Sequence, residues 1–460
     1  MQQADTISAI ATAVGESGIG IIRMSGCDAV AIADQLFCAA GGQRVADSPS
    51  HRALYGRVVD EAGQTLDEVL CLVMRCPHSY TKEDVVELQC HGGNMPLQEI
   101  LALTHRLGTR PAEPGEFTKR AFLNGRLDLT QAQAVMDIIQ SKTQASLHMA
   151  AGHLTGRFSA SIKVARHHIL ELIAHLEAAI DFPEDDIDDI VLSDVVEQVT
   201  ALRSQLAEML RTAHTGRILR EGLETAIIGK PNVGKSSLLN ALLREQRAIV
   251  TEIPGTTRDS IEEYANIGGV PRRIIDTAGI RATEDLVEKI GVEKSRSYVE
   301  RASLVLALFD SSQPLTTEDE EILELIADKE AIVLLNKADL PPVVSPQLLQ
   351  DRLPGTQVLL ISTTQETGMD SLEKAIVERV YGAVQPSGEP AFVSTVRQAD
   401  ILRRADDHLA AVQQTAADGL SLDFLVIDLR SAWEALGEIT GETVGEDIID
   451  QIFSQFCIGK

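Results

Sequence analysis

The feature that most constrains the fold is an octapeptide near the middle of the chain, residues 229–236, with the sequence GKPNVGKS. It follows an apolar run at 225–228 and precedes a leucine-rich run at 238–243. A strand, a glycine-rich loop and a helix in this order form a P-loop, in which backbone N–H groups surround phosphates. The octapeptide therefore predicts a phosphate site in an α/β domain, with Lys235 on the phosphates and Ser236 on Mg²⁺.

Two further motifs indicate which nucleotide is bound. Residues 276–279 read DTAG, where Asp276 can reach Mg²⁺ through water and the Gly279 N–H can sense the γ-phosphate. Residues 336–339 read NKAD and end another apolar run. The Asp339 carboxylate can accept hydrogen bonds from guanine N1–H and the exocyclic amine, whereas adenine would leave it unpaired. The predicted ligand is therefore GTP rather than ATP.

Between these motifs lies a segment, 251–259, where a switch threonine is expected, with Thr257 as the second Mg²⁺ ligand. A last guanine-contacting loop is expected near Ser362, Thr363 and Thr364, where the usual Ser-Ala-Lys-like pattern is degraded. Ile280 stands where Ras-type proteins have the water-orienting glutamine, and its side chain cannot hydrogen-bond. Either hydrolysis is slow, or another group takes that role, with Glu284, Asp285 and Glu288 in the following segment as candidates. The predicted nucleotide contacts are Asn232, Val233, Gly234, Lys235, Ser236, Ser237, Thr251, Glu252, Ile253, Pro254, Gly255, Thr256, Thr257, Asp276, Thr277, Ala278, Gly279, Asn336, Lys337, Asp339 and Ser362.

The periodicity of the sequence divides the chain into four segments. Short β-like runs predict an α+β domain at 1–121, and helical periodicity dominates 122–220. Apolar strands alternate with helices over 221–383, which predicts a mostly parallel sheet covered by helices. Helical periodicity resumes over 384–460 after a Pro/Gly-rich linker. The simplest architecture is a discontinuous all-α domain with the α/β domain inserted into it.

Two long amphipathic helices are predicted before the insert, because apolar residues recur at helical spacing and need helical partners. The positions on their apolar faces are Ile162, Ile169, Leu172, Ile173, Leu176 and Ile180, then Val195, Val199, Leu202, Leu206 and Met209. The acidic run at 184–189 between them is interpreted as a solvated loop rather than a metal site.

Composition excludes several other classes. The formal net charge of −27 disfavours bulk electrostatic binding of nucleic acid. The sequence has no apolar run long enough to span a membrane and no signal-peptide pattern, so we expect a cytoplasmic protein. The six cysteines form no CxxC pair, and burial is expected for most of them, with Cys457 as the exception.

With the nucleotide motifs assigned, the whole chain resembles the MnmE (TrmE) family of bacterial tRNA-modification GTPases. The residues that carry this resemblance are 5–7, 18–26, 86–93, 114–129, 179–183, 255–259 and the terminal FCIGK at 456–460. A stand-alone GTPase domain needs neither the first nor the last of these motifs, so the resemblance is specific.

The resemblance implies a folate site in the N-terminal domain, which in this family is similar to a tetrahydrofolate-binding fold and mediates homodimerisation. Arg23, Glu87, Arg126 and Lys460 match the family's contacts to a 5-formyl-tetrahydrofolate-type one-carbon donor. The family often has lysine at the position of Arg126. Cations suit the glutamate carboxylates of a folate, and an acid suits the donor edge of the pterin.

The resemblance also implies K⁺-dependent pairing of GTPase domains, with Asn232, Thr251, Ile253 and Thr256 as K⁺ ligands. Here K⁺ would supply the charge that an arginine finger supplies elsewhere. The water-orienting acid of the family corresponds to Glu288. Cys457 matches a cysteine that the family presents near its active centre, which makes it a possible catalytic thiol.

The family works with a flavin-dependent partner, MnmG (GidA), and installs an aminomethyl or carboxymethylaminomethyl type of group at C5 of the wobble uridine of certain tRNAs. That partner is expected to provide most of the tRNA contacts. Two alternatives remain at this stage. The chain could be a nucleotide-switched ribosome- or RNP-assembly GTPase without one-carbon chemistry, or its folate site could be vestigial.

Overall fold

The computed structural model describes residues 5–13, 15–181, 188–244, 263–274, 299–382 and 391–460. They form two compact units, Met1–Met136 with Glu434–Lys460, and Asp137–Trp433. We call these unit 1 and unit 2. The four sequence segments proposed above, with boundaries at 121, 220 and 383, stay a prediction.

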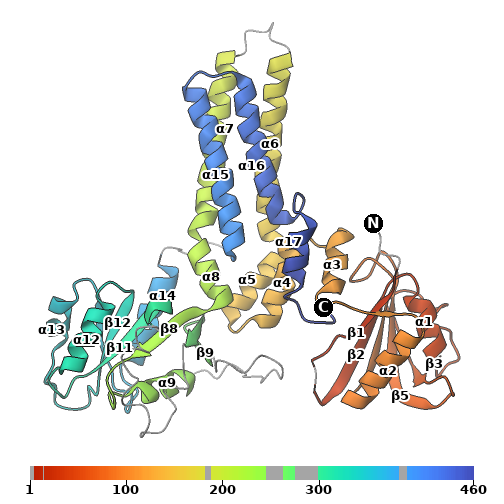
Figure 1. Cartoon of the computed structure of the whole chain (residues 1–460), viewed down its shortest axis with the longest axis horizontal. Coiled ribbons are helices and arrows are strands. Elements are labelled where there is room, and N and C mark those ends of the chain that lie inside the picture. The colour runs from red at the N-terminus through yellow and green to blue at the C-terminus, as the bar shows by residue number, and fades with distance from the viewer. Residues whose placement is uncertain (1–4, 14, 182–187, 245–262, 275–298, 383–390) are drawn as a thin grey trace. The chain divides into compact units, whose positions relative to one another are not determined.

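A seven-stranded sheet with the order β3-β4-β5-β6-β2-β1-β7 forms the base of unit 1. Its elements are β1 (Ile7–Ile10), β2 (Ser17–Ser25), α1 (Ala29–Leu36), β3 (Phe37–Ala39), β4 (Arg52–Val59), β5 (Thr65–Met74), β6 (Val85–Gly92), α2 (Asn94–Arg106) and β7 (Arg110–Pro111). Neighbouring strands are antiparallel except β1 and β7. Helices α1 and α2 pack on one face through Leu36, Ile100 and Leu103 (Figure 1). The predicted α+β class is confirmed.

On the face away from α1 and α2, exposed apolar side chains lie on β4 and β5. Tyr55 on β4 and Leu70 on β5 lie directly opposite each other, with exposed fractions of 57% and 42%. Alternation along a strand explains the arrangement, because residues at every second position face away from the helices.

The last helix of the chain completes unit 1. Here α3 (Glu116–Leu123) and α4 (Leu129–Gln140) meet α17 (Glu446–Phe453). A buried cluster joins them, in which the Phe453 ring lies 6.2 Å from that of Phe122 and 5.1 Å from that of Phe456. The residues that follow α17 are therefore held in unit 1 by burial of apolar surface.

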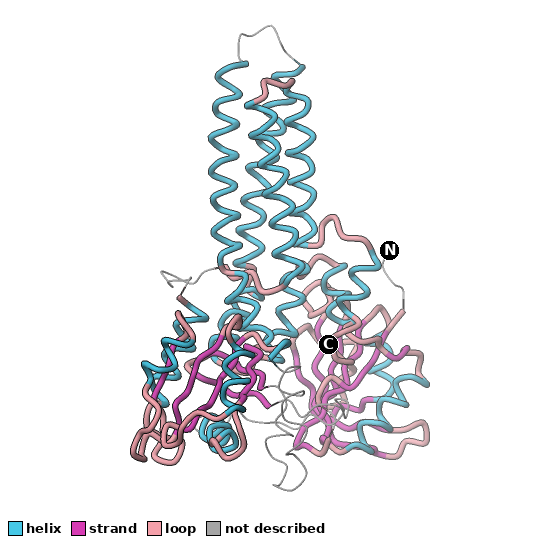
Figure 2. Tube along the Cα trace, turned by 60° about the vertical axis from the view of Figure 1, so that its left-hand side comes forward, coloured by secondary structure: helices cyan, strands magenta, loops and turns pink. Residues whose placement is uncertain are grey.

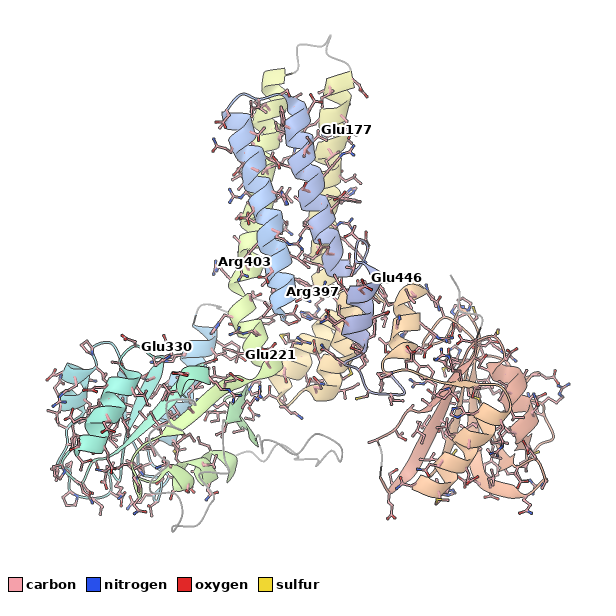
Figure 3. The ribbon with its side chains drawn as sticks, in the orientation of Figure 1. Glu177, Glu221, Glu330, Arg397, Arg403 and Glu446 are labelled. Carbon is pink, nitrogen blue, oxygen red and sulfur yellow. The ribbon has the colours of Figure 1, made fainter. Side chains whose placement is uncertain are left out.

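The helical part of unit 2 contains α5 (Gln144–Leu154), α6 (Arg157–Asp181), α7 (Asp188–Arg211), α8 (Ala213–Glu221), α15 (Val396–Ala417) and α16 (Leu422–Thr440). Figure 2 shows the long helices side by side. Arg203 on α7 pairs with Asp406 on α15 at 2.8 Å, and Glu177 on α6, labelled in Figure 3, pairs with Arg430 on α16. Helices from both sides of the insert thus form one bundle, as predicted.

The predicted apolar faces of the first two long helices are buried at every position except Ile180, which is half-buried. Most of the acidic run between them lies outside the described residues.

The α/β part of unit 2 has a six-stranded sheet with the order β13-β12-β11-β8-β10-β9. Its elements are β8 (Leu223–Ile228), α9 (Lys235–Arg244), β9 (Glu263–Ile267), β10 (Val270–Ile274), β11 (Leu304–Asp310), α12 (Thr317–Ile326), β12 (Ala331–Asn336), α13 (Pro346–Arg352), β13 (Gln357–Leu360) and α14 (Met369–Tyr381). All pairings are parallel except that of β9 with β10. The predicted mostly parallel sheet is confirmed.

Helices cover both faces of this sheet. One buried cluster joins it to α8, α9 and α14, and a second joins it to α12 and α13. The strands carry runs of apolar residues because both faces are buried. In β11 and β12 every residue is buried. This rigid sheet fixes the loops at its carboxyl ends, where ligands of such sheets bind.

Candidate functional sites

The octapeptide 229–236 joins β8 to α9, which is the strand, loop and helix order predicted from the sequence. The Lys235 ammonium donates to the carbonyl oxygens of Gly229 at 2.6 Å and Lys230 at 2.8 Å. Burial lowers the pKa of Lys235. An ammonium has three donors, so two hold the loop and one is left for a phosphate oxygen.

A second loop is hydrogen-bonded to the P-loop from the end of β12. The Asn336 side-chain amide donates to the Val233 carbonyl at 2.8 Å, and its oxygen accepts from the Thr363 N–H at 3.1 Å. Gly234 lies beside this amide with φ of +109°, and a Cβ there would fall 2.2 Å from Asn336 Nδ2. Glycine at this position is therefore required by both backbone conformation and space.

The residues predicted to contact the guanine base also lie within hydrogen-bonding distance of one another. Ser362 follows β13 and is 1% exposed, and its hydroxyl donates to Asp339 Oδ1 at 2.5 Å. Lys337 has a φ of +63°, and its ammonium donates to Asp310 Oδ2 at 2.6 Å. Burial would raise the pKa of Asp310, but the hydrogen bond and charge of Lys337, with help from Ser312, hold it below its usual value.

The structure thus brings together the predicted residues that follow β8, β12 and β13. Val233 is buried, whereas Asn232, Ser236 and Ser237 are exposed on the loop or the first turn of α9. The other predicted contacts lie outside the described residues: Thr251, Glu252, Ile253, Pro254, Gly255, Thr256, Thr257, Asp276, Thr277, Ala278, Gly279 and the acid Glu288.

Sequence reasoning placed Thr363 in the last guanine-contacting loop without a partner, and it missed Asp310 and Asp319. Asp310 holds Lys337, Thr363 bonds to Asn336, and Asp319 holds Lys230. A signal was available for Asp310, because it follows an apolar run in a parallel sheet, where functional side chains gather. No local pattern indicated Asp319, whose partner is distant in sequence.

A second cluster of predicted residues forms in unit 1. Arg23 on β2 lies opposite Glu87 on β6, and their side chains pair at 2.8 Å. Arg23 also donates to the Gly459 carbonyl at 3.2 Å. The Phe117 N–H donates to the Lys460 carbonyl at 3.1 Å, which holds the FCIGK segment beside the sheet.

Aromatic rings line the same cluster. The Arg126 guanidinium lies 4.8 Å from the Tyr80 ring centre, and that of Arg23 lies 5.4 Å from it. Burial lowers the pKa of Lys460, and the charge of Arg23 lowers it further, while Glu87 opposes the change. Two of the four predicted folate-site residues, Arg23 and Arg126, therefore lie over one aromatic ring, while Glu87 pairs with Arg23 and Lys460 lies within electrostatic reach of both. Cations, a carboxylate and an aromatic face can together hold a planar, anionic molecule.

The cysteine expectations were partly wrong. Cys71 and Cys90 are buried, and burial raises the pKa of each thiol to about 12. Cys27, Cys38 and Cys76 are exposed, because the strand face or loop that carries each of them points to solvent. Cys457 is exposed, and its carbonyl accepts from the Gly115 N–H at 3.3 Å.

A search of the described helices for membrane-spanning segments finds no candidate.

The six-stranded sheet of unit 2 and the loops at the carboxyl ends of its strands define a P-loop GTPase domain. Unit 2 is therefore a helical scaffold that carries such a domain. The model described as MnmE helical domain matches residues 129–457, and the model described as GTP-binding protein TrmE N-terminus matches residues 6–126. The chain is 49% identical over 457 residues to a tRNA modification GTPase MnmE of Alkaliphilus metalliredigens, with 99% of each chain covered. It is also 49% identical over 466 residues to the same protein of Geobacillus kaustophilus, with 100% of each chain covered.

The chain therefore belongs to the MnmE family and is a tRNA modification GTPase. This membership decides against the assembly-factor alternative. Among solved structures, the G domain of FeoB from Methanococcus jannaschii is 25% identical and covers 34% of this chain and 97% of its own, with a TM-score of 0.27. That TM-score is too low to carry an argument about the fold.

Proposed function

We propose that the P-loop, the NKAD segment and Ser362 together form the site where this GTPase binds and hydrolyses GTP. The observation that carries the proposal is the meeting of three loops, distant in sequence, at the carboxyl ends of parallel strands. The Asn336 amide ties the base-side loop to the P-loop. The Asp339 carboxylate, oriented by Ser362, can then read guanine by its donor edge.

Two cations complete the proposed site. Ser236 and Thr257 hold Mg²⁺, and Asn232, Thr251, Ile253 and Thr256 hold K⁺. Asn232 is exposed on the P-loop with φ of +60°, a conformation that asparagine tolerates better than most residues. A K⁺ ion there supplies positive charge next to the phosphates as negative charge develops. Glu288 orients the attacking water, which compensates for Ile280.

Unit 1 takes a 5-formyl-tetrahydrofolate-type one-carbon donor in the second cluster. The support is chemical fit. Arg23, Arg126 and Lys460 offer positive charge to the glutamate carboxylates, Glu87 offers an acceptor to the pterin, and Tyr80 offers a stacking face. Cys457, on the same segment as Lys460, is the candidate for a catalytic thiol.

The modification itself adds an aminomethyl or carboxymethylaminomethyl type of group to C5 of the wobble uridine, together with a flavoprotein of the MnmG (GidA) kind. The net charge of −27 favours that partner as the main tRNA-binding surface. The exposed Tyr55–Leu70 pair on β4 and β5 favours homodimerisation through the N-terminal domain. The proposed division is a folate and dimer domain at 1–121, helical parts at 122–220 and 384–460, and a G domain at 221–383, in a cytoplasmic protein.

The first test is GTP hydrolysis by the purified protein in KCl and in NaCl at equal ionic strength. We expect stimulation by K⁺ that Asn232→Ala removes, while Mg²⁺-dependent binding of GDP is retained. Equal, slow rates in both salts would refute the K⁺ part of the proposal.

The second test concerns the folate site and is independent of GTP. Binding of 5-formyl-tetrahydrofolate is measured by calorimetry for the unmodified chain and for Arg23→Ala. Arg44→Ala serves as the control, because Arg44 has an exposed side chain and pairs with Asp34 elsewhere in unit 1. We expect binding to be lost only in Arg23→Ala. Unchanged tRNA modification in that variant would instead indicate a vestigial site.

A further inference from the structure

One residue of the P-loop forms a buried contact that the roles assigned to this loop leave unexplained. The Lys230 ammonium donates to Asp319 Oδ2 at 2.8 Å, across 89 positions of sequence. The exposed fractions of the two side chains are 11% and 1%. Surface ion pairs contribute little because water screens them, whereas removing one partner of a largely buried pair leaves the other charge uncompensated.

Asp319 is itself fixed in place. It is the third residue of α12, and its carboxylate forms a capping box with Thr316. Oδ2 accepts from the Thr316 N–H at 2.9 Å and from its hydroxyl at 2.8 Å. Leu323 and Ile326 on the same helix are buried against the sheet. The carboxylate therefore presents a rigid anchor to Lys230.

Asp319 is linked to Lys235, the lysine assigned to the phosphates, through the backbone carbonyl of Lys230. The carbonyl of Lys230 accepts from the Lys235 ammonium at 2.8 Å. When Asp319 holds the Lys230 side chain, it also limits the positions of that carbonyl. The direction of the remaining Lys235 donor is then set before a nucleotide arrives, so less conformational entropy is lost on binding.

We propose that Asp319 is a positioning residue of this GTPase, which acts through Lys230 to preorganise the P-loop and Lys235 for the phosphates. The inference rests on the proposed assignment of the P-loop as the phosphate site. Since the pair acts on the resting loop, its loss weakens binding of GDP and GTP alike and leaves the hydrolytic step nearly intact.

The test uses full-length Lys230→Met and Asp319→Asn. Asparagine keeps an oxygen that can accept from Thr316, so the helix cap is retained, but it carries no charge and leaves the Lys230 ammonium without its counterion. We expect the dissociation constant of a fluorescent GDP analogue to rise about three- to tenfold in each variant. KM for GTP should rise in parallel, and kcat should change by less than about twofold, because only binding shared by the ground and transition states is lost.

Two further variants separate positioning from folding. Lys230→Arg keeps a donor for Asp319 and should restore affinity, and the double variant Lys230→Met/Asp319→Asn should be no weaker than Lys230→Met alone. Arg352→Met is the matched control, because it removes the exposed ion pair with Glu320, the next residue of α12. It should bind GDP like the unmodified chain.

Three outcomes would overturn the inference: unchanged affinity in Lys230→Met, no rescue by arginine, or an equal loss in Arg352→Met. The variant Lys235→Ala distinguishes failure of the positioning role from a wrong assignment of the phosphate site. If Lys235→Ala loses GDP binding while Lys230→Met keeps it, only the positioning role fails. If Lys235→Ala binds GDP normally, the phosphate site is misassigned and both proposals fail.

Discussion

Replacing Arg272 with methionine should stabilise the α/β part of unit 2. Arg272 lies in β10, between Leu223 on β8 and Ala265 on β9, and is completely buried. None of its three side-chain nitrogen atoms has a hydrogen-bond partner in the part of the chain that the structure describes. A guanidinium out of water without partners opposes folding, because desolvation disfavours the charged form.

The size of the effect follows from the pKa. Burial lowers the pKa of Arg272 to about 9. At 1.36 kcal/mol for each pKa unit, that fall corresponds to at most about 5 kcal/mol. Methionine fills most of the same volume without a charge, and relaxation in the unmodified protein reduces the penalty. We therefore expect Arg272→Met to raise the free energy of unfolding by about 2–4 kcal/mol.

The pH dependence has a defined sign. The folded pKa of Arg272 is lower than the unfolded one, so the unfolded chain binds more protons above about pH 9. The penalty is complete at pH 7–8 and decreases as the pH rises through about 9. The gain from Arg272→Met should therefore be constant between pH 7 and 8 and smaller at pH 10.

Hydrogen exchange measured by mass spectrometry isolates this part of the chain from the other unit. Peptides that cover β8 and β10 should exchange at least about tenfold more slowly in Arg272→Met. Arg273→Met is the control, since Arg273 is half-exposed and pairs with Glu224 at 3.1 Å. It should give no gain. Faster exchange in Arg272→Met would refute the reasoning, because it would mean that the guanidinium stabilises the fold.

Three other perturbations have defined outcomes. Asp310→Asn removes the carboxylate that holds Lys337, so KM for GTP should rise about tenfold with little loss of kcat in steady-state assays, and an unchanged KM would contradict the role. Gly234→Ala should reduce GDP affinity by at least about tenfold in a titration, because φ is +109° and the Cβ meets a neighbouring amide. Burial would raise the pKa of Glu116, but hydrogen bonds, first from Arg110, lower it, so its stabilisation is present at neutral pH and lost as the pH falls through the carboxyl range. Thermal unfolding should show Glu116→Gln to be about 3 kcal/mol less stable at pH 7 and less sensitive to acid, and equal acid sensitivity would count against this account.

The nucleotide site shows how far local reasoning extends. The P-loop, the NKAD segment and Ser362 were predicted because each follows an apolar strand, and strands of a parallel sheet end at one edge. The supporting residues were not predicted. Asp319 belongs to a helix whose cap is visible in the sequence, but nothing local shows that Lys230 reaches it.

The cluster in unit 1 depended on a resemblance rather than on a pattern. From its neighbours in sequence, Arg23 would be interpreted as a surface ion-pair member, and only the register of β2 against β6 brings it to Glu87. Tyr80 belongs to none of the sequence motifs described above, yet both Arg23 and Arg126 lie over its ring. Contacts of this kind depend on how the sheet and the terminal segment pack, and a sequence window does not contain that information.

The sequence by itself predicted the α+β class of the first domain, the mostly parallel sheet, the split helical bundle and the identity of the nucleotide, because periodicity and turn chemistry act over a few residues. The tertiary structure decided which charged side chains have an ion-pair or hydrogen-bond partner. Arg272 and Arg273 are adjacent and chemically identical, but β10 buries the first without a hydrogen-bond partner among the described residues and leaves the second beside Glu224. The energy of a charge depends on water and on groups that are distant in sequence, and only the folded chain fixes both.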